Sequence, residues 1–179
     1  DKWDQYKKIT NKYEFINTPF FWENPKFNSC VCSYKPISRS YFKMIEILNQ
    51  YDFDFPESMK SFHLAEGPGG FIEAIANYRQ NQQDYYIGIS LLDDKNDPNI
   101  PSWKKSEQFL KQNTNVFIET GKDNTGDILS LNNFLYCKDK YASSMDFITA
   151  DGGFDFSVDF NKAAEVASKA AASYRPVGK

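Results

Sequence analysis

Hydrophobic and polar residues follow two spacings from residue 38 onwards, one typical of helices and one of strands. The stretch 38–50 places its apolar residues around one wide side of a helix and leaves Lys43, Glu46 and Gln50 on the other side. Short apolar or β-branched runs bounded by polar residues or glycine predict strands at 61–65, 85–90, 115–119 and 145–150. Helix-forming stretches lie between them at 71–80, at 102–112 with Ser102 as N-cap, and at 130–140.

This order of elements predicts the fold class. Strands joined by single helices imply right-handed crossovers and a mainly parallel sheet with helices on both faces, which is an α/β fold. The final stretch, 161–179, is rich in helix formers as far as Ala172 and then reaches Pro176. Four predicted strands are fewer than a doubly wound sheet normally has. We therefore expect the sheet to be incomplete at the C-terminus, because the chain is part of a longer protein or lacks residues.

The composition is typical of one globular domain, since 41% of the 179 residues are hydrophobic and 25% are charged. No apolar run is long enough to cross a bilayer, and the first residues lack the apolar region of a signal peptide. We therefore expect an intracellular, cytoplasmic protein without a membrane partner. Three cysteines cannot all pair within the chain, and the C-x-C at 30–32 lacks the second ligand pair of a structural zinc site. Reduced thiols and no bound metal are expected.

The net charge of −3 gives no general attraction to nucleic acid, so any RNA-binding surface must be a local patch. We separate an N-terminal aromatic and basic extension, 1–37, from a sheet domain, 38–179, whose later strands are missing. The basic residues in and just after this extension form the best candidate patch; they are Lys7, Lys8, Lys12, Lys26, Lys35, Arg39 and Lys43. A solvated face is the alternative interpretation, and charge alone favours it. The aromatic residues of the extension could stack on a cap or on bases, but packing over the sheet is favoured on grounds of burial.

A glycine-rich turn, E-G-P-G-G, follows the first predicted strand and leads directly into a helix at Phe71. Ligands of parallel sheets bind beyond the carboxyl ends of the strands, and a helix start presents free N–H groups there. The turn matches neither a P-loop nor a complete G-x-G-x-x-G, and Pro68 removes one donor that a diphosphate would use. A ligand with an adenosine and a small zwitterionic tail therefore fits better than a dinucleotide. A purely structural turn is the alternative, but the fourth strand also ends in a carboxylate, Asp151, and paired glycines, which favours a shared site.

Four motifs together resemble a known family. The first is R-x-x-x-K before the sheet, from Arg39 to Lys43, and the second is G-P-G-G-F after the first strand, from Gly67 to Phe71. The third is G-D-I after the third strand, from Gly126 to Ile128, and the fourth is A-D-G-G-F at the end of the fourth strand, from Ala150 to Phe154. Over residues 38 to 158 the chain resembles the FtsJ/RrmJ-type S-adenosylmethionine-dependent ribose 2'-O-methyltransferases. It is most similar to their mRNA-cap branch in eukaryotes and large DNA viruses. The asparagine-, lysine- and phenylalanine-rich composition is also similar to that of proteins from AT-rich viral genomes.

The resemblance implies a Rossmann-like sheet, S-adenosylmethionine as cofactor and capped mRNA as the RNA partner. Of the family's K-D-K-E tetrad, Lys43 and Asp151 match the first two members. The second lysine and the glutamate belong to strands after the fourth, beyond which this sequence ends. The implied cofactor residues lie at the strand ends; they are Glu66, Gly67, Pro68, Gly69, Gly70, Phe71, Ser90 and Asp127. Ser90 stands where many methyltransferases have a ribose-binding acid, and Asp93 or Asp94 could serve instead.

The residues alone leave several alternatives open. Lys43 could be a surface partner of Glu46, which lies three positions along the same helix. His63 is expected to be a core residue of a central strand rather than a base. The alternative to an enzyme is an inactive methyltransferase-fold module. Such a module would bind RNA, or it would serve as a scaffold with a protein partner or with the remaining C-terminal part of the same protein. A nicotinamide-dependent oxidoreductase is opposed by the missing third glycine and by A-D-G-G-F.

Overall fold

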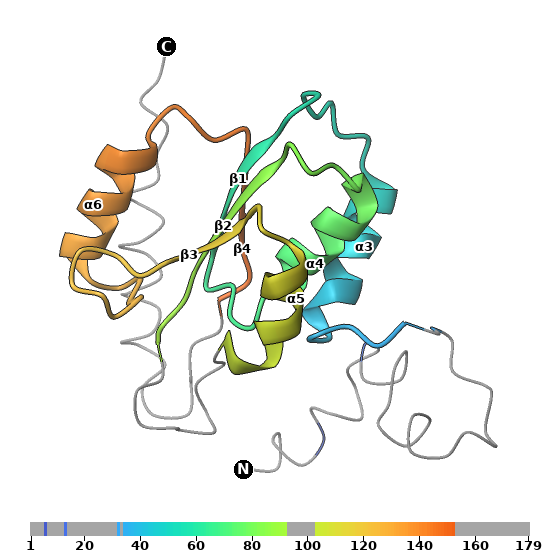
Figure 1. Ribbon diagram of the computed structural model, residues 1–179, viewed down its shortest axis with the longest axis horizontal. Helices are drawn as coiled ribbons and strands as arrows, with labels where there is room; N and C mark the ends of the chain where they lie inside the picture. The colour runs from blue at the N-terminus through green and yellow to red at the C-terminus, as the bar shows by residue number, and fades with distance from the viewer. Residues whose placement is uncertain (1–5, 7–12, 14–31, 33, 93–102, 153–179) are drawn as a thin grey trace.

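The computed structural model describes residues 34–92 and 103–152, together with Tyr6, Tyr13 and Cys32 (Figure 1). The sequence predictions for Asp93, Asp94, Ser102, the stretch 161–179 and most of the N-terminal extension lie outside these residues, so the division of the chain at residue 38 stays a prediction. The described elements are α3 (Ser40–Gln50), β1 (Lys60–Leu64), α4 (Gly70–Arg79), β2 (Tyr85–Ile89), η2 (Trp103–Ser106), α5 (Glu107–Gln112), β3 (Val116–Glu119), α6 (Leu131–Tyr141) and β4 (Phe147–Ala150).

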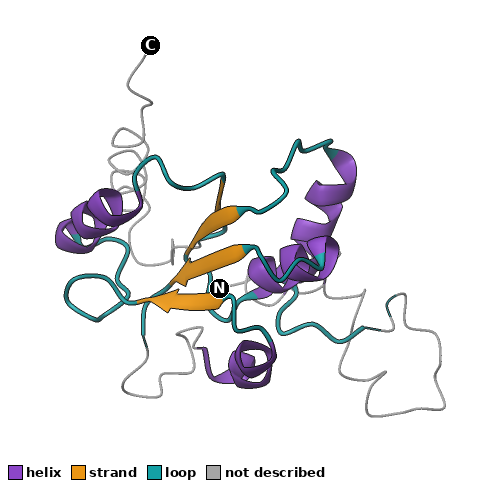
Figure 2. Ribbon diagram, turned by 45° about the horizontal axis from the view of Figure 1, so that its top comes forward, coloured by secondary structure: helices purple, strands orange, loops and turns teal. Residues whose placement is uncertain are grey.

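The four strands form one parallel sheet in the order β3-β2-β1-β4, and Figure 2 shows three of their arrows side by side. In register, Phe62 of β1 lies opposite Ile87 of β2 and Ile148 of β4. Helices α3, α4 and α5 lie on one side of the sheet and α6 lies on the other (Figure 1). The predicted α/β fold with helices on both faces is confirmed, and each predicted strand lies within two residues of an observed one.

The stretch 102–112 is expected as one helix, but its described part, 103–112, forms a short 3-10 helix, η2, followed by α5. Residues three apart lie above one another in a 3-10 helix. This geometry places Trp103 and Ser106 on the same buried side, where the Ser106 hydroxyl donates to the carbonyl oxygen of Pro68. The tighter turn therefore attaches the start of this stretch to the glycine-rich turn after β1, which the local sequence does not indicate.

The two faces of the sheet are packed very differently. A large core fills the space between the sheet and helices α3 and α4; its buried members are Met44, Leu48, Met59, Phe71, Ile72, Ala74, Ile75, Tyr86, Trp103 and Val116. Among the described residues on the α6 side, the buried cluster is small and consists of Phe62, Ile87 and Ile89. A cavity of about 350 Å³ lies there between the sheet and α6, and Ile148 at its margin is 61% exposed. The α6 face is therefore the less completely covered face.

His63 is a core residue of β1, as the sequence predicts. Its side chain is fully buried, with Nδ1 2.7 Å from Thr149 Oγ1 on β4 and Nε2 2.8 Å from Ser61 Oγ. Burial lowers the pKa of His63 to about 3, so the imidazole is neutral at physiological pH. Both ring nitrogens are occupied by hydroxyl groups, which leaves His63 a structural role.

We expect a His63→Asn variant to lose less stability in acid than the wild type. The unfolded chain protonates His63 below pH 6.5, whereas the folded chain stays unprotonated down to about pH 3. The free energy of unfolding therefore decreases as the pH is lowered through this window, by about 1.4 kcal/mol per pH unit for one proton. Urea unfolding at several pH values measures the slope. Equal slopes for wild type and variant between pH 6 and pH 4 would contradict this assignment, because every other titrating group is common to both.

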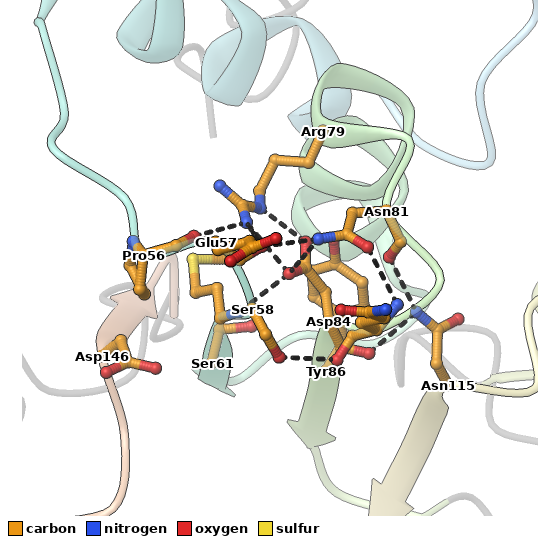
Figure 3. A network of polar contacts seen from close by, with 12 residues as sticks. Pro56, Glu57, Ser58, Ser61, Arg79, Asn81, Asp84, Tyr86, Asn115 and Asp146 are labelled. Carbon is orange, nitrogen blue, oxygen red and sulfur yellow. Dashed lines mark hydrogen bonds and ion pairs between the residues drawn. The ribbon is translucent and has the colours of Figure 1, made fainter.

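A polar network at the amino-terminal edge of the sheet joins β1, β2 and the end of α4 (Figure 3). The Asp84 carboxylate, which is buried, accepts hydrogen bonds from Arg79 Nε at 2.5 Å, the Met59 amide at 2.8 Å and the Tyr86 hydroxyl at 2.8 Å. Burial opposes ionisation of Asp84, but the Arg79 guanidinium and the other donors lower its pKa overall. The network lies at the edge opposite the strand ends where ligands of this fold class bind, so we assign it a structural role.

Candidate active site

Lys43 of α3 and Asp151, which follows β4, form an ion pair at the carboxyl edge of the sheet. Lys43 Nζ lies 2.7 Å from Asp151 Oδ2 and 2.9 Å from Oδ1, although 108 positions separate the residues in the sequence. Their side chains are 35% and 36% exposed, so a ligand can reach both. The alternative that Lys43 pairs with Glu46 is wrong, and the Glu46 carboxylate instead accepts a hydrogen bond from the Tyr13 hydroxyl at 2.5 Å.

Glu66 lies two residues after the end of β1, and its side chain caps the start of α4. Its carboxylate is 6% exposed, and Oε1 accepts hydrogen bonds from the main-chain N–H groups of Phe71 at 2.8 Å and Ile72 at 2.9 Å. Burial raises the pKa of Glu66 to about 8; the two N–H groups oppose this rise, and the nearby carboxylate of Asp151 adds to it. The expectation that the helix start offers free donors to a ligand is therefore wrong for these two groups. The Phe71 side chain lies in the core.

The glycines of the turn allow close approach, but the neighbours that approach two of them belong to the protein itself. Gly69 has φ 109°, and a Cβ there would lie 3.3 Å from Cζ3 of Trp103. A Cβ on Gly70 would lie 2.2 Å from the hydroxyl oxygens of Ser38 and Ser40 at the start of α3. A side chain at Gly69 would therefore strain the backbone and press on Trp103 instead of entering ligand space. Gly67 and Pro68 are half-buried and form the accessible part of the turn.

The turn after β3 packs against the end of β2, which brings Ser90 and Asp127 into one neighbourhood. Gly126 has φ 68°, and a Cβ there would lie 1.9 Å from the carbonyl oxygen of Ser90. Asp127 Oδ1 accepts a hydrogen bond from the Leu129 amide at 2.9 Å. Asn133 of α6, which is buried, holds the turn through a hydrogen bond from its Nδ2 to the Asp127 carbonyl at 3.0 Å.

The resemblance implies that this turn binds S-adenosylmethionine, and substituting Gly126 with alanine should then weaken that binding by about tenfold or more, because a left-handed backbone and a steric clash act together. The left-handed conformation alone costs an L-residue about 1–2 kcal/mol, so the free variant leaves the turn conformation that places Asp127; regaining it on binding at a cost of about 1.4 kcal/mol corresponds to a factor of ten in affinity. The contact with Ser90 cannot accommodate the added methyl group unless the whole turn shifts. Calorimetric titration with S-adenosylmethionine gives the affinity. Circular dichroism of the variant controls for folding, and a folded variant with the affinity of the wild type would contradict this prediction.

The structure thus brings together most of the predicted site residues at one edge, and it adds residues that the sequence did not indicate. Lys43, Glu66 and Asp151 form one group of ionisable side chains, while Ser90 and Asp127 lie at the neighbouring strand ends. The additional residues are Trp103 and Ser106, which support the glycine-rich turn, and Asn133, which supports the turn after β3. The sequence could have indicated Asn133, because its spacing of four residues from Cys137, which is four from Tyr141, puts all three on the inward face of α6.

Two further searches are restricted to the described residues. Within 34–92 and 103–152, no three histidine, cysteine, aspartate or glutamate side chains are arranged to hold a metal ion. In the same part of the chain, every helix is too short or too polar to traverse a lipid bilayer.

Comparison with known proteins assigns the chain to a family. The model of the family described as FtsJ-like methyltransferase matches residues 36–172. An uncharacterized protein of Acanthamoeba polyphaga mimivirus is 32% identical over 130 residues, which are 65% of this chain and 15% of that protein. The cap-specific mRNA (nucleoside-2'-O-)-methyltransferase 2 of Danio rerio is 27% identical over 169 residues, covering 88% of this chain and 21% of that protein.

A probable methyltransferase of African swine fever virus is 24% identical over 181 residues, covering 91% of this chain and 37% of that protein. The chain therefore spans between 15% and 37% of the length of these relatives. Because the family model covers most of the sequence, from residue 36 to residue 172, the chain belongs to the FtsJ-like methyltransferase family.

Proposed function

We propose that this chain carries the donor-binding part of an RNA ribose 2'-O-methyltransferase that uses S-adenosylmethionine and acts on capped mRNA. The contact between Lys43 and Asp151 carries the proposal, since the resemblance assigns these two residues to the reaction centre and their side chains meet. The printed activity of the Danio rerio relative supports the choice of cap ribose as the substrate. The exposed Lys35 and Arg39 lie close to Lys43 in the sequence and support RNA binding on this side.

The residues at the carboxyl edge fit a positively charged cofactor better than a dinucleotide. The N–H groups of Phe71 and Ile72, which would receive a phosphate, are already bound to Glu66. Glu66 and Asp151 place two carboxyl groups where a pyrophosphate would add further negative charge. S-adenosylmethionine instead carries a positive sulfonium, which carboxylates attract. In this proposal Gly67 and Pro68 contact the donor together with the neighbouring strand ends, at Ser90 and Asp127.

The mechanism assigns a separate task to each member of the ion pair. When bound, S-adenosylmethionine supplies an activated methyl group for in-line displacement. Lys43 stabilises the negative charge that develops on the ribose 2'-oxygen, and its ammonium does so from a position fixed before the substrate arrives. Asp151 holds Lys43 with both carboxylate oxygens and thereby orients it. The partial exposure of both side chains leaves room for the ribose.

The test uses a protein that includes the strands following the fourth, because the resemblance assigns the second lysine and the glutamate to them. Calorimetry measures binding of S-adenosylmethionine, and mass spectrometry measures methylation of capped RNA. Capped RNA that already carries a 2'-O-methyl group on its first nucleotide is the matched control, and it should accept less methyl. Methyl transfer to a base instead of a ribose would overturn the proposal. Binding of RNA without any methyl transfer would favour the inactive RNA-binding module.

A further inference from the structure

Glu66 is a buried carboxyl group without a positively charged partner among the described residues. Its carboxylate is 6% exposed and makes two hydrogen bonds, both from uncharged main-chain N–H groups. The buried carboxylate of Asp84 differs, because the Arg79 guanidinium neutralises it. A carboxylate that is taken out of water without a counter-ion is costly, and it tends to remain protonated.

The groups around Glu66 come from five elements. Asp151 after β4 is negative and close enough to raise the pKa of Glu66, and Lys43 of α3 is engaged with both oxygens of Asp151. The start of α4 contributes the two N–H groups. Gly88 of β2 lies against the Glu66 side chain, Trp103 of η2 lies against Gly88, and neither carries a charge. The groups named around Glu66 are therefore two carboxyl groups, its own and that of Asp151, and one ammonium, so a further positive charge would balance them.

We propose that Glu66 releases its proton when the positively charged methyl donor binds and takes one up again when the spent, uncharged product occupies the site. The inference rests on the proposed function, because it requires the sulfonium of S-adenosylmethionine near the glycine-rich turn. Methyl transfer removes the positive charge: the carbon–sulfur bond breaks, sulfur keeps the electron pair, and the ribose oxygen bonds to the methyl group and releases its proton to solvent. A Glu66 carboxylate left without a counter-ion then takes a proton from solution, and the site loses its preference for the ligand.

The physical basis is the difference in charge between donor and product. At neutral pH the free site holds Glu66 mostly in its uncharged form, because burial raises its pKa to about 8. A cation within a few ångströms favours the ionised form and lowers the pKa again. S-adenosylhomocysteine has an uncharged thioether in place of the sulfonium and provides no such stabilisation. Glu66 therefore favours the donor over the product, which reduces product inhibition.

Calorimetry of the full protein in two buffers of different ionisation enthalpy counts the protons exchanged on binding. At pH 7 we expect S-adenosylmethionine to release close to one proton from Glu66 and S-adenosylhomocysteine to release almost none. The dissociation constant of the donor should be about 50-fold higher at pH 6 than at pH 8, since binding requires an ionised group of pKa about 8. In the free protein, a carboxyl-carbon NMR titration should find one glutamate that titrates near this pH.

Glu66→Gln is the decisive variant, because glutamine retains the oxygen that accepts the Phe71 and Ile72 amides but cannot ionise. It should abolish the proton release and weaken donor binding at pH 8 by about tenfold or more, while product affinity changes little. Glu73→Gln is the matched control: Glu73 is also buried with a raised pKa, but it binds the Tyr34 hydroxyl and the Ile37 amide instead. Its proton release should equal that of the wild type.

The possible outcomes distinguish failure of this inference from failure of the proposed function on which it rests. Donor binding without proton exchange, or equal weakening of donor and product by Glu66→Gln, would overturn the inference and leave the cofactor assignment standing. The second result would show that Glu66 only caps α4. If neither compound binds to the wild type, the cofactor assignment itself is wrong, and the inference fails with it.

Discussion

A Lys43→Ala variant of the full protein is expected to transfer methyl groups at least about a hundredfold more slowly than the wild type. Removal of a group that stabilises developing charge costs two to three orders of magnitude in other enzymes. Lys43 is held by both carboxylate oxygens of Asp151, so under the proposed function its ammonium is preorganised for the nascent 2'-oxyanion. The affinity for S-adenosylmethionine should change little, because Lys43 acts on the acceptor. Single-turnover kinetics and calorimetry measure the two effects separately.

The control for this variant is Lys111→Ala. Lys111 is an exposed lysine in the last turn of α5, and it pairs with Glu107 one helical turn before it. It tests whether the loss of any lysine slows the reaction, and we expect wild-type turnover. Full activity of Lys43→Ala would refute the assignment of Lys43 to the reaction centre. A wild-type protein that binds donor and RNA but never transfers methyl would favour the binding module.

The largest effect on stability is expected for Asp84→Ala, which should lower the free energy of unfolding by about 3–5 kcal/mol. Breaking a buried ion pair costs this much because the remaining charge loses its partner. Here the substitution would also leave the Met59 amide and the Tyr86 hydroxyl without their acceptor (Figure 3). Unfolding in urea, followed by circular dichroism, gives the free energy. Asp84→Asn retains one acceptor oxygen and should lose less.

The same carboxylate makes stability depend on pH in a defined direction. Because the folded chain lowers the pKa of Asp84, the contribution of Asp84 to stability is present above the ordinary pKa of an aspartate and is lost as the pH falls below that value.

The control for Asp84→Ala is Glu107→Ala, which removes an exposed partner of Lys111 and should leave stability near that of the wild type. A comparable loss in both variants would show that burial of the Asp84 network has little energetic importance.

Local patterns predicted most of the fold. The four strands, three of the helices and the parallel arrangement follow from hydrophobic spacing and from the handedness of crossovers. The division of 103–112 into η2 and α5 was missed, because it depends on the contact of Ser106 with Pro68, 38 positions away. No property of the stretch itself indicates that contact.

The site was predictable in part for a similar reason. The motifs placed Lys43 and Asp151 at one site, and the strand order brings the second residue to the correct edge. The glycine-rich turn was identified, but the purpose of two of its glycines was not, since Trp103 and Ser38 approach them from other parts of the chain. Likewise, a glutamate after a strand does not disclose that it will cap the following helix, because this depends on how the turn folds back.

The unequal covering of the sheet has a consequence for how the chain folds during synthesis. The buried members of the large core all lie between Met44 and Val116, so this face can close as soon as those residues have left the ribosome. The opposite face depends on α6 and on the surroundings of Ile148, which are made later, and it still contains the 350 Å³ cavity. Folding can therefore proceed in a vectorial order. The core on the α3 and α4 face forms first, on the emerging chain, and the α6 face packs onto the sheet afterwards.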